Sequence, residues 1–357
     1  MGETVKDSCI IGQDDLILVT GATGFIGSRL VRSLLDRGFH NLRCFTRSSS
    51  EIAKGESAWR DHPNGQQVEV VRGNLLSPED CAAATRNVAV IFHLAASRGE
   101  KFFPDAFMNS VVTTRNLLEA AHRFGGLRRF VNVSSFTVYT NEKNTRGRLL
   151  DESCPVEKQP ALRGEAYTFG KVKQEEIVVE YGENFKIPYV IVRPGVVYGP
   201  GNEAITGRVG IGTFGLFLHL GGSNTIPFTY VDNCAEAIAL AGLRQGVDGE
   251  VFNVVDDDLP SSRKFLRLYK KHAGRFKSIY VPHFLSYLLC CMWERYVLRS
   301  EGQMPLAFTR RRWYANWKRT RYSNEKLKTR LAWTQTVSTP EGLKRYFESC
   351  RNRGLHA

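Results

Sequence analysis

Six short runs of mostly apolar residues recur within the first 200 positions of the chain, and segments with helical spacing separate several of them. The runs occupy residues 16–20, 42–46, 68–72, 88–94, 129–134 and 189–192, and the helical segments occupy residues 26–37, 107–124 and 167–181. Continuous apolar runs indicate strands buried on both faces, as in a parallel sheet covered by helices. The alternation therefore predicts an α/β fold with a doubly wound parallel sheet.

The alternation weakens after Gly199, where the chain becomes rich in glycine. Two late strands, expected at 228–231 and 251–255, would return to the sheet. A length of 357 residues allows one large domain or two intimate ones. We expect a core at residues 14–199 with later returns around 228–255, and a smaller, discontinuous substrate-binding or lid region at residues 200–227 and 256–357.

The net charge of +13 is unevenly distributed along the chain. Residues 262–357 hold 22 Lys or Arg against 5 Asp or Glu, which leaves 22 − 5 = +17 there and −4 elsewhere. A cationic end attracts phosphates, nucleic acid or an anionic membrane face, although an ordinary solvated surface explains it equally well.

The eight cysteines form no Cys-x-x-Cys pair, so no metal site and a reducing, cytoplasmic setting are expected. No apolar run reaches the roughly 18 residues that cross a bilayer. The start of the chain also lacks the layout of a secretion signal.

A glycine-rich turn follows the first run, with the sequence Thr-Gly-Ala-Thr-Gly-Phe-Ile-Gly at residues 20–27. Gly21 permits a tight turn, Gly24 lets the backbone approach a pyrophosphate, and Gly27 allows close packing of helix and strand. An anion is stabilised at the helix N-terminus that follows. The turn predicts a Rossmann-type dinucleotide site made by Gly21, Thr23, Gly24, Phe25, Ile26 and Gly27.

The spacing Gly-x-x-Gly-x-x-Gly resembles that of the extended short-chain dehydrogenase/reductase superfamily, in its epimerase/dehydratase-like branch. Later motifs extend the resemblance over most of the chain, including Arg-Pro-Gly-Val-Val-Tyr-Gly-Pro at residues 193–200. The resemblance implies that the cofactor is also contacted by Asn74, Leu75, Ala95, Ala96, Pro194 and Val197. Family members usually carry aspartate where this chain has Asn74. His93 is expected to be a packed structural residue.

The cofactor preference is indicated by the end of the second run. An acidic residue there would hold the ribose hydroxyls of NAD, but the chain has Arg47 and Ser48 instead. Arginine pairs with a 2′-phosphate and serine can donate to it. We therefore expect NADP, with NAD as the alternative.

The catalytic prediction centres on Tyr167 and Lys171, which share one helix face at a spacing of four residues. A nearby ammonium stabilises phenolate and so makes the phenol a usable acid or base. Lys171 can also bond the nicotinamide ribose. The family pattern adds the hydroxyl of Ser135, which would hold the substrate oxygen against Tyr167. The expected chemistry is hydride transfer between a secondary alcohol and a ketone.

The substrate class is less constrained. No carboxylate follows Ser135, which disfavours the dehydratase chemistry seen in some relatives. A hydrophobic, steroid- or flavonoid-like substrate is the first choice, because the end of the chain resembles hydroxysteroid-dehydrogenase-like members. A nucleotide-sugar epimerase is the alternative. Candidate substrate residues are Ser135, Thr137 and Arg208, and Arg310, Arg311 and Arg312 are further candidates for a diphosphate.

Other partners are also considered. Residues 282–298 are apolar and aromatic, and we favour a buried lid helix over a segment in a membrane interface. A non-catalytic relative that senses NADP or binds nucleic acid through Trp313, Tyr314 and Trp317 is the third reading, and nucleic acid is not the expected partner. The resemblance implies a homodimer that pairs through the helices at 107–124 and 167–181.

Overall fold

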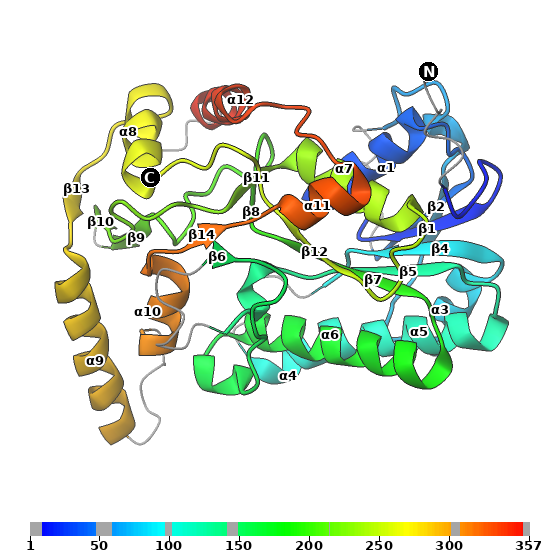
Figure 1. The fold of residues 1–357 in the computed structure, drawn as a ribbon, viewed down its shortest axis with the longest axis horizontal. Helices are drawn as coiled ribbons and strands as arrows, with labels where there is room; N and C mark the ends of the chain where they lie inside the picture. The colour runs from blue at the N-terminus through cyan, green and yellow to red at the C-terminus, as the bar shows by residue number, and fades with distance from the viewer. Residues whose placement is uncertain are drawn as a thin grey trace.

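The computed structural model describes residues 9–47, 59–96, 102–140, 149–213, 215–300 and 308–352. A seven-stranded sheet forms its centre, with the order β3-β2-β1-β4-β5-β7-β12 and every neighbouring pair parallel (Figure 1). Its strands are β1 (Leu16–Thr20), β2 (Leu42–Thr46), β3 (Glu69–Arg72), β4 (Val88–His93), β5 (Arg129–Val133), β7 (Tyr189–Pro194) and β12 (Val251–Val254). The predicted doubly wound α/β fold is confirmed.

Helices cover both faces of this sheet, so its strands are largely buried, except for the edge strand β3 (Figure 1). One layer holds α1 (Phe25–Asp36), α7 (Val231–Leu243) and α11 (Glu325–Leu331). The other layer holds α3 (Pro78–Thr85), α4 (Phe103–Ala106), α5 (Thr113–Phe124) and α6 (Ala166–Phe185). In α1 the fully buried residues Leu30, Val31 and Leu34 recur at the spacing of one helix face, which explains why this segment docks as a helix.

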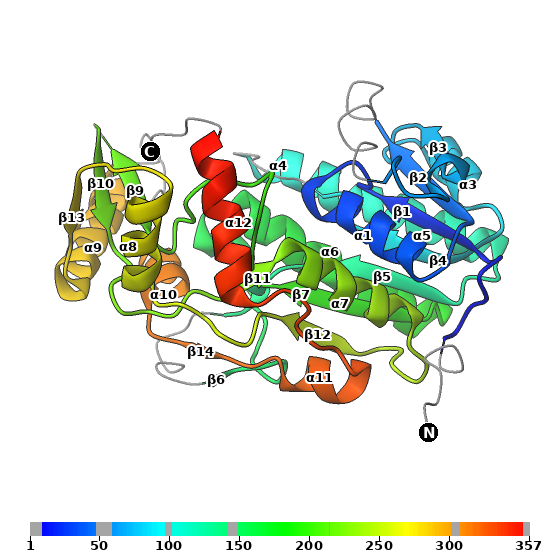
Figure 2. The same cartoon turned by 90° about the horizontal axis from the view of Figure 1, so that it is seen from above.

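A smaller region lies at the end of the molecule where the carboxyl ends of the strands point (Figures 1 and 2). It contains paired strands β8 (Val196–Tyr198) and β11 (Phe228–Tyr230), the sheet of β9 (Gly210–Thr213), β10 (Leu216–His219) and β13 (Ser278–Tyr280), and the pair β6 (Leu149–Leu150) and β14 (Arg321–Tyr322). Its helices are α8 (Ser262–His272), α9 (His283–Arg299), α10 (Arg310–Trp317) and α12 (Thr339–Asn352). None of the helices in the described ranges is long and apolar enough to cross a bilayer.

Two helical predictions can be compared with the structure. The segment at 107–124 is helical throughout, as predicted, and its first part, Phe107–Val112, is a π-helical stretch that precedes α5. The hydroxyl of Thr113 donates back to the Asn109 carbonyl at 2.9 Å within this wider turn. The segment at 282–298 forms α9 as a helix, but it is not buried, since only Ser286, Cys290 and Val297 within α9 are inaccessible.

Candidate active site

The glycine turn lies where the strand order reverses, between the carboxyl ends of β1 and β4. Gly21 has a φ of +69°, and a Cβ there would lie 2.9 Å from the backbone nitrogen of Ala95. A Cβ at Gly27 would lie 2.1 Å from the Gly21 carbonyl oxygen. Side chains are therefore excluded at both positions. The N-terminus of α1 faces the crevice where the strand order reverses, which is where doubly wound parallel sheets bind their ligands.

A cavity of about 860 Å³ extends from this turn across the carboxyl edge of the sheet. Sixteen of the sequence-predicted residues line it. They are Gly21, Thr23, Gly24, Phe25, Ile26, Gly27, Arg47, Asn74, Leu75, Ala95, Ala96, Ser135, Tyr167, Lys171, Pro194 and Val197. Segments far apart in the sequence therefore meet in one site.

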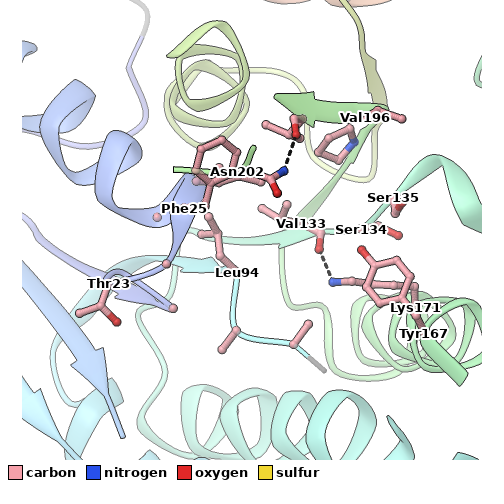
Figure 3. A pocket seen from close by; sticks show the side chains of 18 of the residues that line it. Thr23, Phe25, Leu94, Val133, Ser134, Ser135, Tyr167, Lys171, Val196 and Asn202 are labelled. Carbon is pink, nitrogen blue, oxygen red and sulfur yellow. Dashed lines mark hydrogen bonds between the residues drawn. The ribbon is translucent and has the colours of Figure 1, made fainter. Parts of the chain in front are cut away.

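The three predicted catalytic side chains lie together where β5 ends against the first turns of α6 (Figure 3). Tyr167 and Lys171 project from the same face of α6. Ser135 follows β5 in an extended conformation, and its hydroxyl oxygen accepts a hydrogen bond from the Thr137 backbone nitrogen at 3.3 Å. This arrangement brings a phenol, an ammonium and a hydroxyl to one wall of the cavity.

The Lys171 ammonium is held in place by two acceptors. It donates to the Val133 carbonyl at 2.6 Å, as Figure 3 shows, and to the side-chain oxygen of Gln174 at 2.9 Å. Only 4% of the residue is exposed, and this burial lowers the pKa of the ammonium to about 8, although the Glu175 carboxylate opposes the shift. Gln174 in turn donates to the Thr114 hydroxyl at 2.9 Å.

His93 continues this buried chain of hydrogen bonds toward the glycine turn. Its Nε2 lies 2.9 Å from the Thr114 hydroxyl, and its Nδ1 lies 2.8 Å from the Thr20 hydroxyl. Because the Thr114 hydroxyl already donates to the Ser110 carbonyl, Nε2 must be the donor and Nδ1 the acceptor. Burial lowers the pKa of His93 to about 3, and the Lys171 charge acts in the same direction. The prediction of a packed, structural histidine is confirmed.

The far end of the cavity is lined by neutral side chains. These are Asn202, Ala204, Ile205, Thr206, Phe265 and Tyr346. Within the part of the chain that the structure describes, Arg47 and Lys171 are the only charged residues of the whole lining. The Arg47 guanidinium is exposed, so the charge lies near the rim at the β2 end of the cavity.

Several lining residues were not found from the sequence. Asn109 and Thr113 reach the cavity from the π-helical stretch and its junction with α5. A π-helical turn has no clear sequence pattern, although such turns are frequent at functional sites. Phe265 and Tyr346 come from α8 and α12, and their positions depend on how the smaller region packs on the core.

Two predicted substrate residues lie elsewhere. Arg208 does not line the cavity, because its guanidinium donates to the Ala315 carbonyl at 3.0 Å and to the Tyr322 hydroxyl at 3.2 Å. Thr137 is also absent from the lining, and its carbonyl accepts from Arg163 at 2.6 Å. Ser48 lies outside the described residues.

The arginines proposed for a diphosphate are bound to carboxylates. Arg310 pairs with Glu294 at 2.8 Å, Arg311 with Glu157 at 3.0 Å and Arg312 with Glu165 at 3.2 Å. None of the three lines the cavity.

The first half of the cavity fits a nicotinamide dinucleotide. A side chain at Gly24 would lie 3.1 Å from the Gly21 carbonyl oxygen, so the open cradle before α1 depends on glycine. The first turn of α1 contains no acidic residue to repel a phosphate. The side-chain oxygen of Asn74 accepts from the Leu76 backbone nitrogen at 3.0 Å and retains a second lone pair for an adenine amine.

Comparisons with known proteins agree with this geometry. Residues 17–254 match the model of the NAD dependent epimerase/dehydratase family. A 3 beta-hydroxysteroid dehydrogenase/Delta 5-->4-isomerase of Mycobacterium tuberculosis is 33% identical over 53% of this chain, and the match covers 49% of that relative. The chain thus spans about half the length of the first curated relatives that it matches.

Two further similarities cover nearly the whole chain. A 2-alkyl-3-oxoalkanoate reductase of Stenotrophomonas maltophilia is 27% identical over 92% of this chain and 97% of its own length. The solved structure of a UDP-glucuronic acid 4-epimerase from Bacillus cereus, in complex with NAD, is 23% identical, with a TM-score of 0.69, and covers 94% of this chain and 99% of its own. This chain therefore belongs to the NAD dependent epimerase/dehydratase family, in the extended short-chain dehydrogenase/reductase superfamily.

Proposed function

We propose that this protein is an NADP-dependent oxidoreductase that interconverts a secondary alcohol and a ketone on a largely apolar, steroid- or flavonoid-like substrate. The neutral far end of the cavity is the observation that supports this substrate class. A diphosphate-linked sugar needs arginine or lysine partners, because burying its charge without them is costly. The smaller region would close over such a substrate through Phe265 and Tyr346.

Each catalytic side chain has a distinct role in this proposal. A bound nicotinamide cofactor would supply the hydride acceptor for the alcohol carbon or the hydride donor for the ketone carbon. Ser135 donates a hydrogen bond to the substrate oxygen and holds it beside Tyr167. In the oxidative direction the alcohol proton passes to Tyr167, and in the reductive direction the Tyr167 phenol supplies it. Lys171 favours the phenolate by its charge.

The choice of NADP rests on the end of β2. No carboxylate occupies the position that would hold the ribose hydroxyls of NAD, whereas the exposed Arg47 lines the cavity there. Arginine offers paired donors to a 2′-phosphate. The cofactor named with the solved Bacillus cereus structure is NAD, so the preference of this chain needs its own measurement.

The alternative function is a nucleotide-sugar epimerase, favoured by the activity of that structural neighbour. Both readings use the same Tyr167 and Lys171. They differ in net redox change, since an epimerase returns the hydride to its substrate and consumes no cofactor.

The test is to supply NADPH with a panel of steroid and flavonoid ketones and, separately, UDP-sugars. We expect NADPH oxidation with an apolar ketone and no conversion of the sugars. Epimerised sugar without net cofactor oxidation would favour the alternative. Absence of cofactor binding, measured by calorimetry, would refute both functions and the NADP-sensor alternative, and would leave only nucleic-acid binding.

A homodimer is also proposed, formed by the layer of α5 and α6. Exposed aromatic and apolar side chains at Phe107, Met108 and Phe124 on this layer support it. Light scattering during size-exclusion chromatography gives the mass directly, and the mass of a single chain at micromolar concentration would contradict the proposal.

A further inference from the structure

One face of α9 presents a row of large apolar side chains to solvent. We call Phe284, Leu285, Leu288, Leu289, Met292 and Tyr296 the α9 ridge, and they are 39% to 75% exposed. Their spacing places them on one side of the helix. Soluble proteins seldom leave a contiguous apolar surface of this kind uncovered unless it binds something.

The opposite face of α9 attaches the helix to the body of the protein. Cys290 is buried in a small cluster with Leu220, Trp313 and Trp317. The Trp313 ring nitrogen donates to the Ser286 hydroxyl at 2.9 Å. The helix is thus held at the outer end of the molecule, beyond the sheet (Figures 1 and 2), with the ridge facing away from the protein body.

Positive charge is concentrated in α9 and in the segments that precede it along the chain. Residues 262–300, which form α8, β13 and α9, contain nine Lys or Arg and one acidic residue, Glu294. Glu294 is already paired with Arg310. Arg295 and Arg299 are exposed in the last turns of α9. The Arg263 guanidinium, on α8, lies 5.5 Å from the centre of the exposed Tyr280 ring on β13.

The exposed apolar ridge and the positive charge together indicate which kind of partner binds this surface. A second copy of the chain would bring two strongly positive faces together, and like charges across an interface are costly. An anionic lipid surface satisfies both features, because apolar side chains enter the acyl boundary while Lys and Arg meet the headgroups. Each such cation near an anionic leaflet strengthens the attraction.

We propose that α9 lies in the plane of an anionic lipid bilayer, with the α9 ridge inserted and the basic residues of α8, of the segment before β13 and of α9 against the headgroups. The anchored face of α9 fixes the helix along the protein surface, so it rests on the membrane and does not span it. The α9 ridge lies outside the cavity, so its binding to a membrane does not depend on the proposed reaction.

The test is flotation of the full chain with vesicles of phosphatidylcholine alone or with phosphatidylglycerol added. We expect binding to the anionic vesicles that weakens as salt is raised. Leu289→Asp in the ridge should reduce the partition coefficient by about tenfold or more. Leu162→Asp is the matched control, because Leu162 is 56% exposed against 52% for Leu289 but lies outside the ridge.

Both variants should keep the wild-type melting temperature, since both leucines are exposed. Equal binding to neutral and anionic vesicles, binding by Leu289→Asp at the wild-type level, or no binding at all would each overturn the proposal. A drop in oligomeric mass caused by Leu289→Asp but not by Leu162→Asp would show that a second copy covers the ridge instead.

Discussion

His93 makes the stability of this protein depend on pH in a way that the structure allows us to calculate. Its ring is fully buried, accepts from Thr20 at Nδ1 and donates to Thr114 at Nε2. Protonation would place a second donor at Nδ1, opposite a hydroxyl that now donates to it, and close to the Lys171 charge. The native state therefore holds this imidazole neutral.

The sign of the effect follows from the two pKa values. His93 has a pKa of about 3 in the folded chain, whereas histidine in an unfolded chain has a pKa of about 6.5. The unfolded state binds the extra proton first, so stability is complete above pH 6.5 and is lost as pH falls toward 3. Between pH 7 and pH 5 the loss is about 2 kcal/mol.

The assay is urea unfolding followed by tryptophan fluorescence at pH 7 and pH 5. His93→Gln cannot gain the charge, so it isolates this contribution from that of the carboxylates. We expect the wild-type free energy of unfolding to fall by about 2 kcal/mol more than that of His93→Gln. Equal losses in the two proteins would refute the argument that the folded state excludes the proton from this ring.

Three further predictions follow from the site. Gln174→Leu removes an acceptor from the Lys171 ammonium, so the alkaline limb of the pH–rate profile should move to lower pH, while Gln174→Glu should move it to higher pH. Arg47→Glu should weaken NADP binding by about tenfold or more and spare NAD, measured by calorimetry; equal effects on both would contradict the proposed phosphate contact. Gly27→Ala places a Cβ against the Gly21 carbonyl and should cost about 1–3 kcal/mol, whereas Gly207→Ala, with open space around it, should stay within about 0.5 kcal/mol in thermal unfolding.

The central sheet could be predicted because its strands, apart from the edge strand β3, are largely buried on both faces and so carry a continuous apolar signal. The first two strands have the predicted bounds, Leu16–Thr20 and Leu42–Thr46, and the next four differ by one or two residues at one end. The glycine turn could also be predicted. The neighbouring backbone lies so close to Gly21 and Gly27 that a side chain at either position would clash with it.

The parts that the sequence did not reveal depend on long-range packing. The sequence predicts Arg208 as a partner for an anionic substrate. In the structure its guanidinium instead donates to Ala315 and Tyr322, which come from a distant part of the chain. The buried chain through Gln174 and Thr114 likewise joins side chains sixty positions apart. The apolar pattern of residues 282–298 favours a buried lid helix over a membrane interface, and only the exposure of the α9 side chains shows that they face outward.

In the proposed mechanism the Tyr167 phenol is the group that exchanges a proton with the substrate. The direct measurement is turnover by Tyr167→Phe, with the ketone that the wild-type enzyme reduces fastest and with NADPH affinity measured in parallel. We expect kcat to fall by about 100-fold to 10,000-fold while the cofactor Kd stays unchanged. Turnover at the wild-type rate by a variant that still binds NADPH would contradict the central claim.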